Sequence, residues 1–598
     1  WAVLWDPQYQ GKVNMFDDCY ITFPMIALYA GAKDPYNLTD AEFDACAAAL
    51  KALRPQIRTI ARGFNDAEAI YAAGDAVLGY CQNISIVFNL QNKGKKFGYS
   101  FPKEGTPTWI DNAVLTPKGQ RDVVYQFIND NLTPEWQSRF IQFSFNNGVL
   151  TAQGFNGSTQ RTMAIGGSAF VNNTTLTATG GANLDVTPTA SVANAGTISI
   201  DGGTLTLGSA WSSTGAITAT GATVQLGGSF TSASVATLSR SGGTVNVTGT
   251  WDNTGTTFVL DAARGVWNLQ AGTVRHGTLD FAGGRLVCGP SNLNTLDGVT
   301  LLDELVLDVP SSRVRILGGT TAPSFLLRAS GTSLAFPDGY VLSVPIVVDV
   351  TNGGSANLEA AAAGATVTIG PSGSVTTAPT NLGGVNLGGV QWFAKPTIIN
   401  QGQIRMTTPA RTMVIDPTAF TNTGSVTATA GSVDIRSAQG AMANLSISGA
   451  GTSMLVNGDY TLGGTFNIDA GTTLTLSGAW SNGGAINLNG GTLNLDGTFS
   501  IANLGGFVNT GGTVNITGVL DNTGGTLALT PATGTWHLVG GTILGGTISQ
   551  TGGATLDYAP TSSNILNNVT FADEFVASTP SGRVRFVGNT SAPSYRLP

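Results

Sequence analysis

From about residue 160 to the end of the chain, short runs of alternating apolar and polar residues recur at intervals of about 20 residues. Examples are T-L-T-L at 204–207 and 473–476, and T-V-N-V at 244–247, with Gly-Gly, Asn-Thr-Gly and Asp-Gly turns between such runs. Alternation with a period of two is typical of β-strands, and regular recurrence is typical of a solenoid. We therefore predict that residues 166–598 form an all-β right-handed parallel β-helix, with no helix beyond about residue 170.

The sequence also contains a longer repeat, which spans many coils. Trp211 recurs as Trp480 and Trp267 recurs as Trp536, in both cases about 269 residues later in the chain. Arg313-Val314-Arg315 recurs as Arg583-Val584-Arg585, at a spacing one position longer than that of the tryptophans, so one residue is inserted between these landmarks. The second copy stops soon after the first copy's Thr321-Ala322-Pro323 is matched by Ser591-Ala592-Pro593. We expect the super-repeat to be truncated at its end.

Residues 1–153 have a different character, since charged residues are common there and apolar residues recur at helical spacing. The patterns predict helices over 21–29, 40–53, 66–73, 119–131 and 134–146, and strands near 77–80, 84–88 and 108–114. Helices that alternate with short strands indicate an α/β layer fold. We assign 1–153 to this part and 154–165 to a junction.

Composition excludes several classes of function. The net charge is −8 and basic runs are few, which argues against nucleic-acid binding. The chain has only His276 and His537, so neither a His-based zinc site nor a Ser-His-Asp triad is expected, and no cofactor or metal is predicted. The sequence also lacks a clustered acid pair and an apolar run of about 18 residues, so we expect neither an enzyme nor a membrane span.

The chain begins at Trp1 without a signal segment, and we expect its natural start to lie upstream. The four cysteines are Cys19, Cys46, Cys81 and Cys288, and their spacing does not fix any pairing.

Several phrases in residues 1–153 occur in the order found in a known family. They are W-A-V-L-W-D-P-Q-Y-Q-G-K-V, F-D-D, F-P-K-E-G-T-P-T-W-I-D-N and Y-Q-F-I-N-D-N-L-T-P-E-W. This quarter of the chain resembles the bacterial periplasmic spermidine/putrescine-binding proteins of ABC importers. The resemblance implies the second lobe of a two-lobed clamshell, an ABC permease as partner and a location in the periplasm.

The resemblance also implies a ligand site for a small cation such as putrescine or spermidine. Carboxylates pair with ammonium groups, and aromatic faces hold the methylenes. Trp109 and Asp111 match the family's Trp-x-Asp phrase, and Asp18 matches the carboxylate after the first strand of the lobe. Tyr80 and Gln82 are further candidates. Ile21 and Gln82 depart from the family's usual Glu and aromatic residue, which favours putrescine over spermidine.

Each candidate also has a structural interpretation. Asp18 could cap the helix that follows it, Trp109 could be packed core, and Asp111 could cap a loop. For Asp18, Trp109 and Asp111 these alternatives stay open at the level of sequence.

Residues 160–598 resemble the β-helical passenger regions of bacterial secreted adhesins and autotransporters, which implies a location at the cell surface. Five tryptophans could form a ladder for carbohydrate, although core packing is the favoured interpretation: Trp211, Trp251, Trp267, Trp480 and Trp536. Arg313 and Arg315 share one strand face, and a solvated stripe is favoured over an anion site.

Three readings of the whole chain remain. It is a fragment of a polyamine-type solute-binding protein joined to an extracellular β-helical region, a surface adhesin-like structural protein without ligand transport, or an artefactual fusion of two unrelated reading frames.

Overall fold

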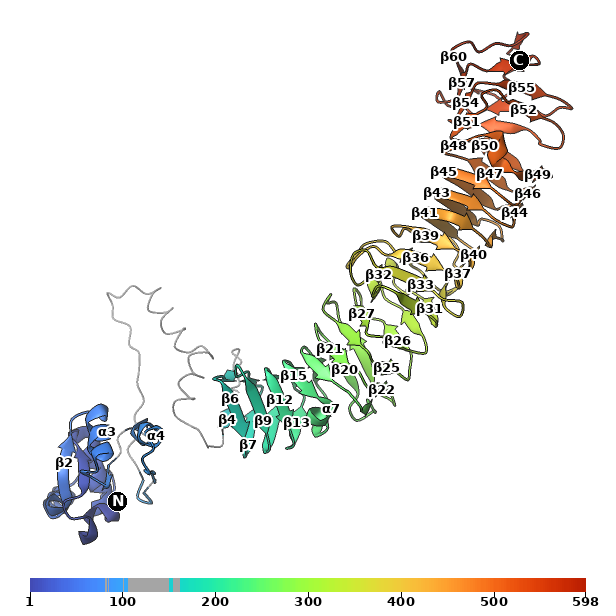
Figure 1. Cartoon of the computed structure of the whole chain (residues 1–598). Helices are drawn as coiled ribbons and strands as arrows, with labels where there is room; N and C mark the ends of the chain where they lie inside the picture. Colours follow the sequence, from blue (N-terminus) through green and yellow to red (C-terminus); the bar gives the residue numbers. More distant parts are fainter. Residues whose placement is uncertain (81–82, 84, 101, 106–149, 154–161, 598) are drawn as a thin grey trace, which may run out of the picture. The chain divides into compact units, whose positions relative to one another are not determined.

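The computed structural model describes residues 1–80, 83, 85–100, 102–105, 150–153 and 162–597. The chain divides into two compact units, the first beginning at Trp1 and the second holding almost all residues after Val149. Figure 1 shows the first unit in blue and the second in green to red. Cys81, Gln82, Trp109 and Asp111 lie outside the described residues, as do the elements predicted over 108–146.

The first unit is built on a three-stranded parallel sheet in the order β2-β1-β3. Its elements are β1 (Val13–Phe16), α1 (Cys19–Ala30), α2 (Asp40–Leu53), β2 (Ile57–Ala61), α3 (Phe64–Ala73), β3 (Leu78–Gly79) and α4 (Ser85–Asn92), preceded by two short 3-10 turns. Strand β1 is buried along its whole length because it is central. The predicted α/β layer fold is confirmed for this part of the chain.

The ends of the helices predicted from the sequence coincide with capping interactions in the structure. Thr39 and Glu42 form a capping box at the start of α2, and α1 ends at Gly31, whose φ of 85° suits glycine. The predicted helices over 21–29, 40–53 and 66–73 are therefore confirmed.

The strand predicted over 84–88 is wrong, because this segment begins helix α4. Asn89 and Lys93 are four residues apart, and both side chains donate to the carboxylate of Glu68 on α3. A helix places these two positions on one face, whereas the short apolar run alone fits either structure. The sequence reading also missed β2, whose pairing with β1 supplies one edge of the sheet.

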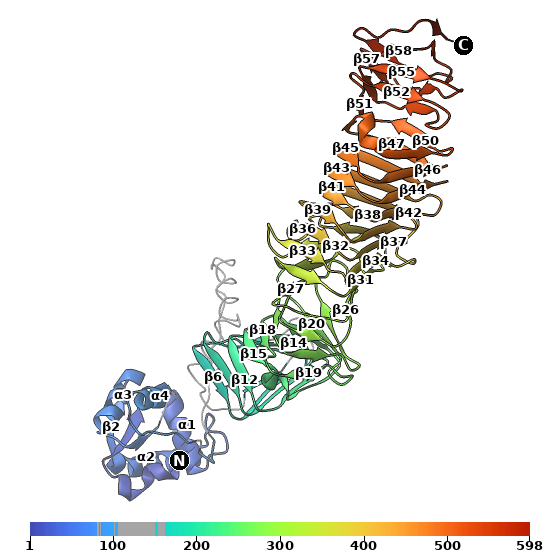
Figure 2. The same ribbon diagram turned by 45° about the vertical axis from the view of Figure 1, so that its right-hand side comes forward.

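The second unit is a parallel β-solenoid of about 21 turns, seen from two directions in Figures 1 and 2. Three ladders of parallel strands run along its first part. One contains β4 (Leu150–Gln153), β7 (Thr175–Thr179), β10 (Thr197–Asp201), β13 (Ile217–Thr220) and β16 (Leu238–Ser241). The next contains β5 (Thr162–Ile165), β8 (Asn183–Val186), β11 (Thr204–Leu207), β14 (Thr223–Leu226), β17 (Thr244–Val247), β20 (Val266–Leu269) and β23 (Arg285–Cys288).

The third ladder extends along most of the solenoid. It contains β6 (Ala169–Asn172), β9 (Ser191–Asn194), β12 (Ala210–Ser213), β15 (Ser229–Thr231), β18 (Thr250–Asp252), β21 (Thr273–Arg275), β24 (Thr295–Asp297), β27 (Arg313–Leu317), β29 (Thr332–Phe336), β32 (Ser355–Ala360), β35 (Gly384–Leu387), β38 (Thr412–Ile415), β41 (Ser432–Met442), β43 (Ser453–Leu462), β45 (Thr473–Asn482), β47 (Thr492–Leu495), β50 (Thr513–Ile516), β53 (Trp536–Leu538) and β56 (Leu556–Tyr558). A further ladder contains β26 (Leu305–Leu307), β28 (Phe325–Leu327), β31 (Pro345–Val348), β34 (Ser374–Thr377), β37 (Gln403–Met406), β40 (Ser425–Ala428) and β42 (Leu445–Ile447).

Many strands repeat the same inward pattern. In β11, Leu205 and Leu207 are buried while Thr204 and Thr206 face outward, and Leu205 pairs with Val224 of the next coil. The predicted period-two strands and parallel stacking are thus confirmed. The right-handed sense stays a prediction. One short helix, α7 (Ser232–Val235), lies at a coil corner, so the expectation of no helix beyond residue 170 is wrong at this turn.

Buried asparagines hold the corners of the solenoid. Nδ2 of Asn172 donates to Oδ1 of Asn194 at 2.7 Å, and Nδ2 of Asn194 donates to Oγ of Ser213 at 2.8 Å. A buried amide is tolerated only when its donors and acceptors are paired, and stacking supplies partners from coil to coil. This explains why Asn recurs at the turns of a chain whose interior is otherwise apolar.

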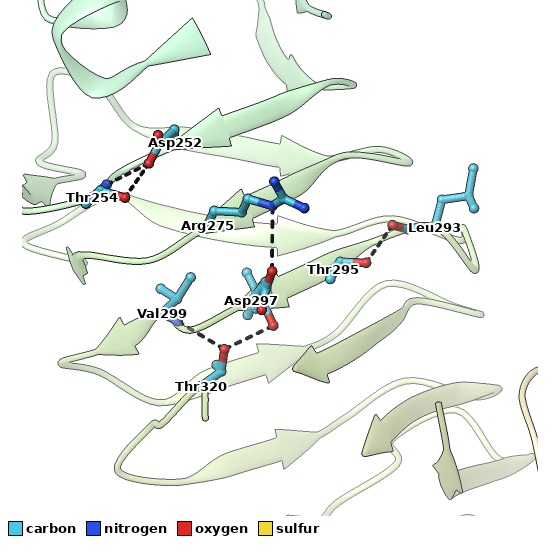
Figure 3. A network of polar contacts seen from close by, with 9 residues as sticks. Asp252, Thr254, Arg275, Leu293, Thr295, Asp297, Val299 and Thr320 are labelled. Atoms are coloured by element: carbon cyan, nitrogen blue, oxygen red, sulfur yellow. Dashed lines mark hydrogen bonds and ion pairs between the residues drawn. The ribbon is translucent and has the colours of Figure 1, made fainter. Parts of the chain in front are cut away.

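The outer side of the corners is also paired. Asp252 accepts from the backbone N and Oγ1 of Thr254 at 3.0 and 2.6 Å, and these hydrogen bonds lower the pKa of the Asp252 carboxyl (Figure 3). The same close-up also shows a buried pairing, in which Oγ1 of Thr320 accepts from the backbone N of Val299 at 3.1 Å. Asp521, the counterpart of Asp252 in the second copy of the super-repeat, caps its own turn in the same way.

The super-repeat is visible in three dimensions. Nε1 of Trp211 donates to the backbone O of Gly227, and Nε1 of Trp480 donates to that of Asp496, both at 3.0 Å and both between equivalent positions of the two copies. Helix α7 has its counterpart in a 3-10 turn over Ile501–Leu504. The two copies therefore fold alike.

The five tryptophans proposed for a ladder are all buried, with Trp251 fully enclosed. Core packing is confirmed for them, and they offer no face on which a sugar could stack.

A strap formed by residues 388–396 covers part of the outer surface. Trp392 lies over the guanidinium of Arg313, 3.9 Å from the ring centroid, and Phe393 lies over that of Arg315 at 5.4 Å. Burial beneath the strap lowers the pKa of Arg313. The prediction that these arginines form a solvated stripe is wrong, because a segment about 80 residues later in the chain folds back over them.

The described cysteines differ in their exposure to solvent. Cys19 is exposed, whereas Cys46 and Cys288 are buried, and none of the three forms a disulfide. Burial raises the pKa of Cys288 to about 12 and also raises that of Cys46. We expect iodoacetamide at about pH 8 to label Cys19 in the native chain, and to label Cys46 and Cys288 only after unfolding, as measured by peptide mass. Labelling of native Cys288 would contradict the burial.

Candidate ligand-binding site

The carboxyl ends of the three parallel strands meet at one edge of the first unit. Asp17 and Asp18 follow β1, Arg62 follows β2, and Tyr80 follows β3. In open parallel sheets, ligands bind outside this edge. The topology thus brings together two of the predicted ligand residues, Asp18 and Tyr80, from segments that are far apart in the sequence.

Asp18 caps helix α1. Its Oδ1 accepts from the backbone N of Tyr20 at 2.9 Å, and its side chain is half-buried. The structural interpretation of Asp18 is therefore confirmed. Because a carboxylate has several acceptor positions, capping by one oxygen is compatible with an ammonium at another.

Tyr80 is 4% exposed and belongs to the core of the first unit. Its backbone N donates to the O of Asn14 in β1 at 3.2 Å, and its ring lies 5.8 Å from that of Trp1. At 4% exposure, little of this residue's surface is accessible to a ligand. A role beside the methylenes of a ligand stays a prediction.

Three helices begin at this edge. Helix α1 follows β1, α3 follows β2, and α4 follows β3, where Oδ1 of Asn83 accepts from the backbone N of Ser85 at 2.9 Å. Helix N-termini favour negative charge, so the edge needs carboxylates before it can hold a cation. Asp17, Asp18 and Asp66 supply them, and Oδ2 of Asp66 accepts from the backbone N of Arg62.

Trp109, Asp111 and Gln82 lie outside the described residues, so their place relative to this edge stays a prediction. Among the described residues, no three His, Cys, Asp or Glu side chains come close enough together to hold a metal ion. None of the described helices combines the length and the apolar character needed to cross a membrane.

Comparison with known proteins assigns this region. Residues 1–152 match the family of bacterial extracellular solute-binding proteins. The spermidine/putrescine-binding periplasmic protein of Escherichia coli (strain K12) is 30% identical over 137 residues, which cover 23% of this chain and 38% of that relative. The spermidine/putrescine-binding periplasmic protein 1 of Haemophilus influenzae is 29% identical over 115 residues, 19% of this chain and 31% of the relative.

The chain therefore spans well under half of the length of these relatives. The predicted resemblance is confirmed for residues 1–152. No solved structure matches the chain significantly.

One contact within the first unit gives a pH dependence. The ammonium of Lys93 and the amide of Asn89 donate to Glu68 and hold its pKa below the usual 4.5, with Lys93 the larger cause. A lowered folded-state pKa means that the contact stabilises the region above pH 4.5 and that this stability is lost as pH falls through the lower pKa. We expect Glu68→Gln to be less stable than the parent above pH 4.5, with the difference closing in acid.

Urea unfolding at a series of pH values, followed by the helix circular dichroism signal of the first unit, measures this effect. A destabilisation of Glu68→Gln that persists unchanged in acid would show that packing rather than charge causes it.

Proposed function

We propose that residues 1–153 form the second lobe of a polyamine-type solute-binding protein of an ABC importer, with the β-solenoid as an extracellular region of the same chain. The observation that carries the proposal is the match of residues 1–152 to the solute-binding family, with relatives named for spermidine and putrescine. Family membership favours an exported, ligand-binding and non-enzymatic protein, in the periplasm or at the cell surface.

The proposed ligand is a small cation with primary amines, putrescine rather than spermidine. Asp18 at the carboxyl edge of the sheet supports this, and Asp111 and Trp109 would complete the site with Tyr80 and Gln82 at its margin. Each charged hydrogen bond to an amine contributes about 1.5–3 kcal/mol.

Calorimetry with putrescine tests the proposal. The full chain is compared with a chimera in which the E. coli relative supplies the part of its own length that this chain does not match. Since clamshell affinity comes from closing two lobes, we expect weak or no binding by the full chain and measurable binding by the chimera.

Two substitutions of Asp18 separate its roles in the chimera. Asn caps a helix about as well as Asp, so Asp18→Asn keeps α1 stable while removing the charge, and we expect about a tenfold or greater loss of affinity. Asp18→Ala also removes the cap and lowers stability by about 0.5–2 kcal/mol. Unchanged affinity after loss of both Asp18 and Asp111, or tight binding of an anion, would end the polyamine proposal.

A structural role at the cell surface is the second candidate. The solenoid occupies residues 162–596, far more of the chain than the solute-binding region, and its outward positions are rich in Thr, Ser and Asn. Adhesion of the purified solenoid to glycan-coated and host-cell surfaces, without any effect of the Asp18 variants on transport, would favour this role. Long-read DNA across the codons for residues 145–170 tests whether one reading frame joins the two parts.

A further inference from the structure

A groove lies on the outer face of the second copy of the super-repeat, where one line of strands ends. Among the described residues β56 pairs only with β53, and its counterpart β23 in the first copy pairs only with β20. Many further coils follow β23 in the first copy, so the break at this point belongs to the repeat itself. The groove has a volume of about 300 Å³, and sites for small molecules have volumes of about 300–1,000 Å³.

A column of outward polar side chains leads into this groove. Asn515 of β50 lies in register with His537 of β53, and His537 lies in register with Asp557 of β56. Nδ1 of His537 is 3.9 Å from Oδ2 of Asp557, whose other oxygen accepts from Oγ1 of Thr555 at 3.1 Å. Because Asp557 lies against Nδ1, the second ring nitrogen of His537 remains available, and it has no hydrogen-bond partner among the described residues.

The groove combines unpaired polar atoms with apolar surface. Nδ2 of Asn515 already donates to Oδ1 of Asn494 at 2.8 Å, which leaves Oδ1 of Asn515 for another donor. The lining contains the polar residues Thr513, Asn515, His537 and Thr579 and the apolar residues Val539 and Ala559. A ligand would therefore meet hydroxyl groups, an amide oxygen and an imidazole nitrogen beside aliphatic carbon.

Longer side chains occupy the equivalent place in the first copy. There, Nη1 of Arg285 donates to Oδ2 of Asp308 at 2.5 Å, and the neighbouring Val287 is buried. The second copy has Thr555 and Ser578 at the positions of this ion pair. The shorter side chains leave the groove open, so the two copies differ at this point of the surface although they fold alike.

We propose that the groove beside His537 binds a neutral sugar ring. Sugar hydroxyls both donate and accept hydrogen bonds, as the unpaired atoms of Thr513, Asn515 and His537 require, and the C–H groups of the ring suit Val539 and Ala559. His537 and Asp557 face each other, so their column holds no excess formal charge that would select an ionic ligand. The site lies in the solenoid and is separate from the cation site proposed for residues 1–153.

Titration of the full chain with sugars, followed by the nuclear magnetic resonance signals of isotope-labelled histidine, tests the proposal. The chain holds only His276 and His537, so the two signals report on two separate places, and His537→Asn assigns them by the loss of one. The probes are the methyl glycosides of glucose, galactose, mannose and N-acetylglucosamine and their linear oligomers, with glucuronate as anionic and putrescine as cationic probe. We expect a neutral sugar to shift the His537 signal saturably and to leave that of His276 unchanged.

Matched variants place the sugar within the groove. Thr555→Arg combined with Ser578→Asp rebuilds the ion pair of the first copy, and we expect this double variant to lose the sugar-induced shift while the His276 signal stays as in the parent. Thr513→Ala removes one free hydroxyl and should weaken the affinity about three- to tenfold, as expected for one neutral hydrogen bond. Thr244→Ala is the control, because Thr244 is the counterpart of Thr513 in the first copy, and it should leave the affinity unchanged.

Three results would overturn the proposal. The first is a His537 signal that no neutral probe shifts, and the second is a shift caused only by glucuronate or only by putrescine. The third is a sugar-induced shift that persists in the double variant, because the sugar would then bind outside the groove.

Discussion

Replacing Glu359 by alanine is expected to release the strap and to destabilise the surrounding coils by about 3–5 kcal/mol. Glu359 is 1% exposed, and its Oε1 accepts from the backbone N atoms of Gln391 and Trp392 at 2.5 and 2.9 Å, with that of Phe393 at 3.3 Å. The hydroxyl of Ser333 donates to its other oxygen. Alanine leaves these donors without a partner in a dry interior.

Phenylglyoxal modification of Arg313 and hydrogen exchange of β29 and β32 measure the release. Glu574→Ala is the control, because Glu574 is exposed. Among the described residues it pairs only with Arg596, at 3.2 Å, and with Ser594. We expect this substitution to lower the free energy of unfolding by about 1 kcal/mol or less. An Arg313 that stays unreactive in Glu359→Ala would show that ring stacking alone holds the strap.

Replacing Trp251 by alanine is expected to destabilise the coils around it by about 3–5 kcal/mol, because a large buried ring leaves a cavity that a stacked coil cannot close. Its ring centroid lies 5.3 Å from that of Trp267 and 4.8 Å from that of Phe258. Its Nε1 donates to Oγ of Ser232 at 2.8 Å. Since coils interact mainly with their neighbours, the loss should be greatest in β15, β18 and β21.

Local hydrogen exchange measures this loss better than one melting temperature, because long repeat arrays need not unfold in one step. Trp251→Leu is the matched variant, since the second copy has the buried Leu520 at the corresponding position, and we expect a clearly smaller loss. Equal losses of stability in the two variants would mean that the hydrogen bond of Trp251, which both substitutions remove, contributes more to stability than the volume of its ring.

The solenoid could be predicted because its signal is local and repeated. Each strand such as β11 shows its inward Leu205 and Leu207 in four residues, and stacking follows from repetition. The short apolar run that begins α4 carries no such signal, and the contact of its Asn89 with Glu68 of the preceding helix α3 is seen only in the folded structure. The burial of Arg313 could not be predicted, since Trp392 reaches it only through the folded strap.

The candidate site was predictable in part. The topology brings Asp18 and Tyr80 to the same edge, but the burial of Tyr80 could not be predicted from residue patterns. Tyr80 packs against the ring of Trp1, which is a contact between distant segments.

The single inserted residue of the second copy has a consequence for how such a rod changes length. It lies between Gly553 and Leu556, beside a glycine turn, and Trp536 still pairs with Leu556 as Trp267 pairs with Leu286. A slip within a strand would have turned every inward side chain outward. An exchange of DNA between the two copies would therefore delete or add a block of about 270 residues while every strand keeps the face it buries. The solenoid can therefore become shorter or longer by whole super-repeats during evolution, while the same apolar residues continue to pack in its core.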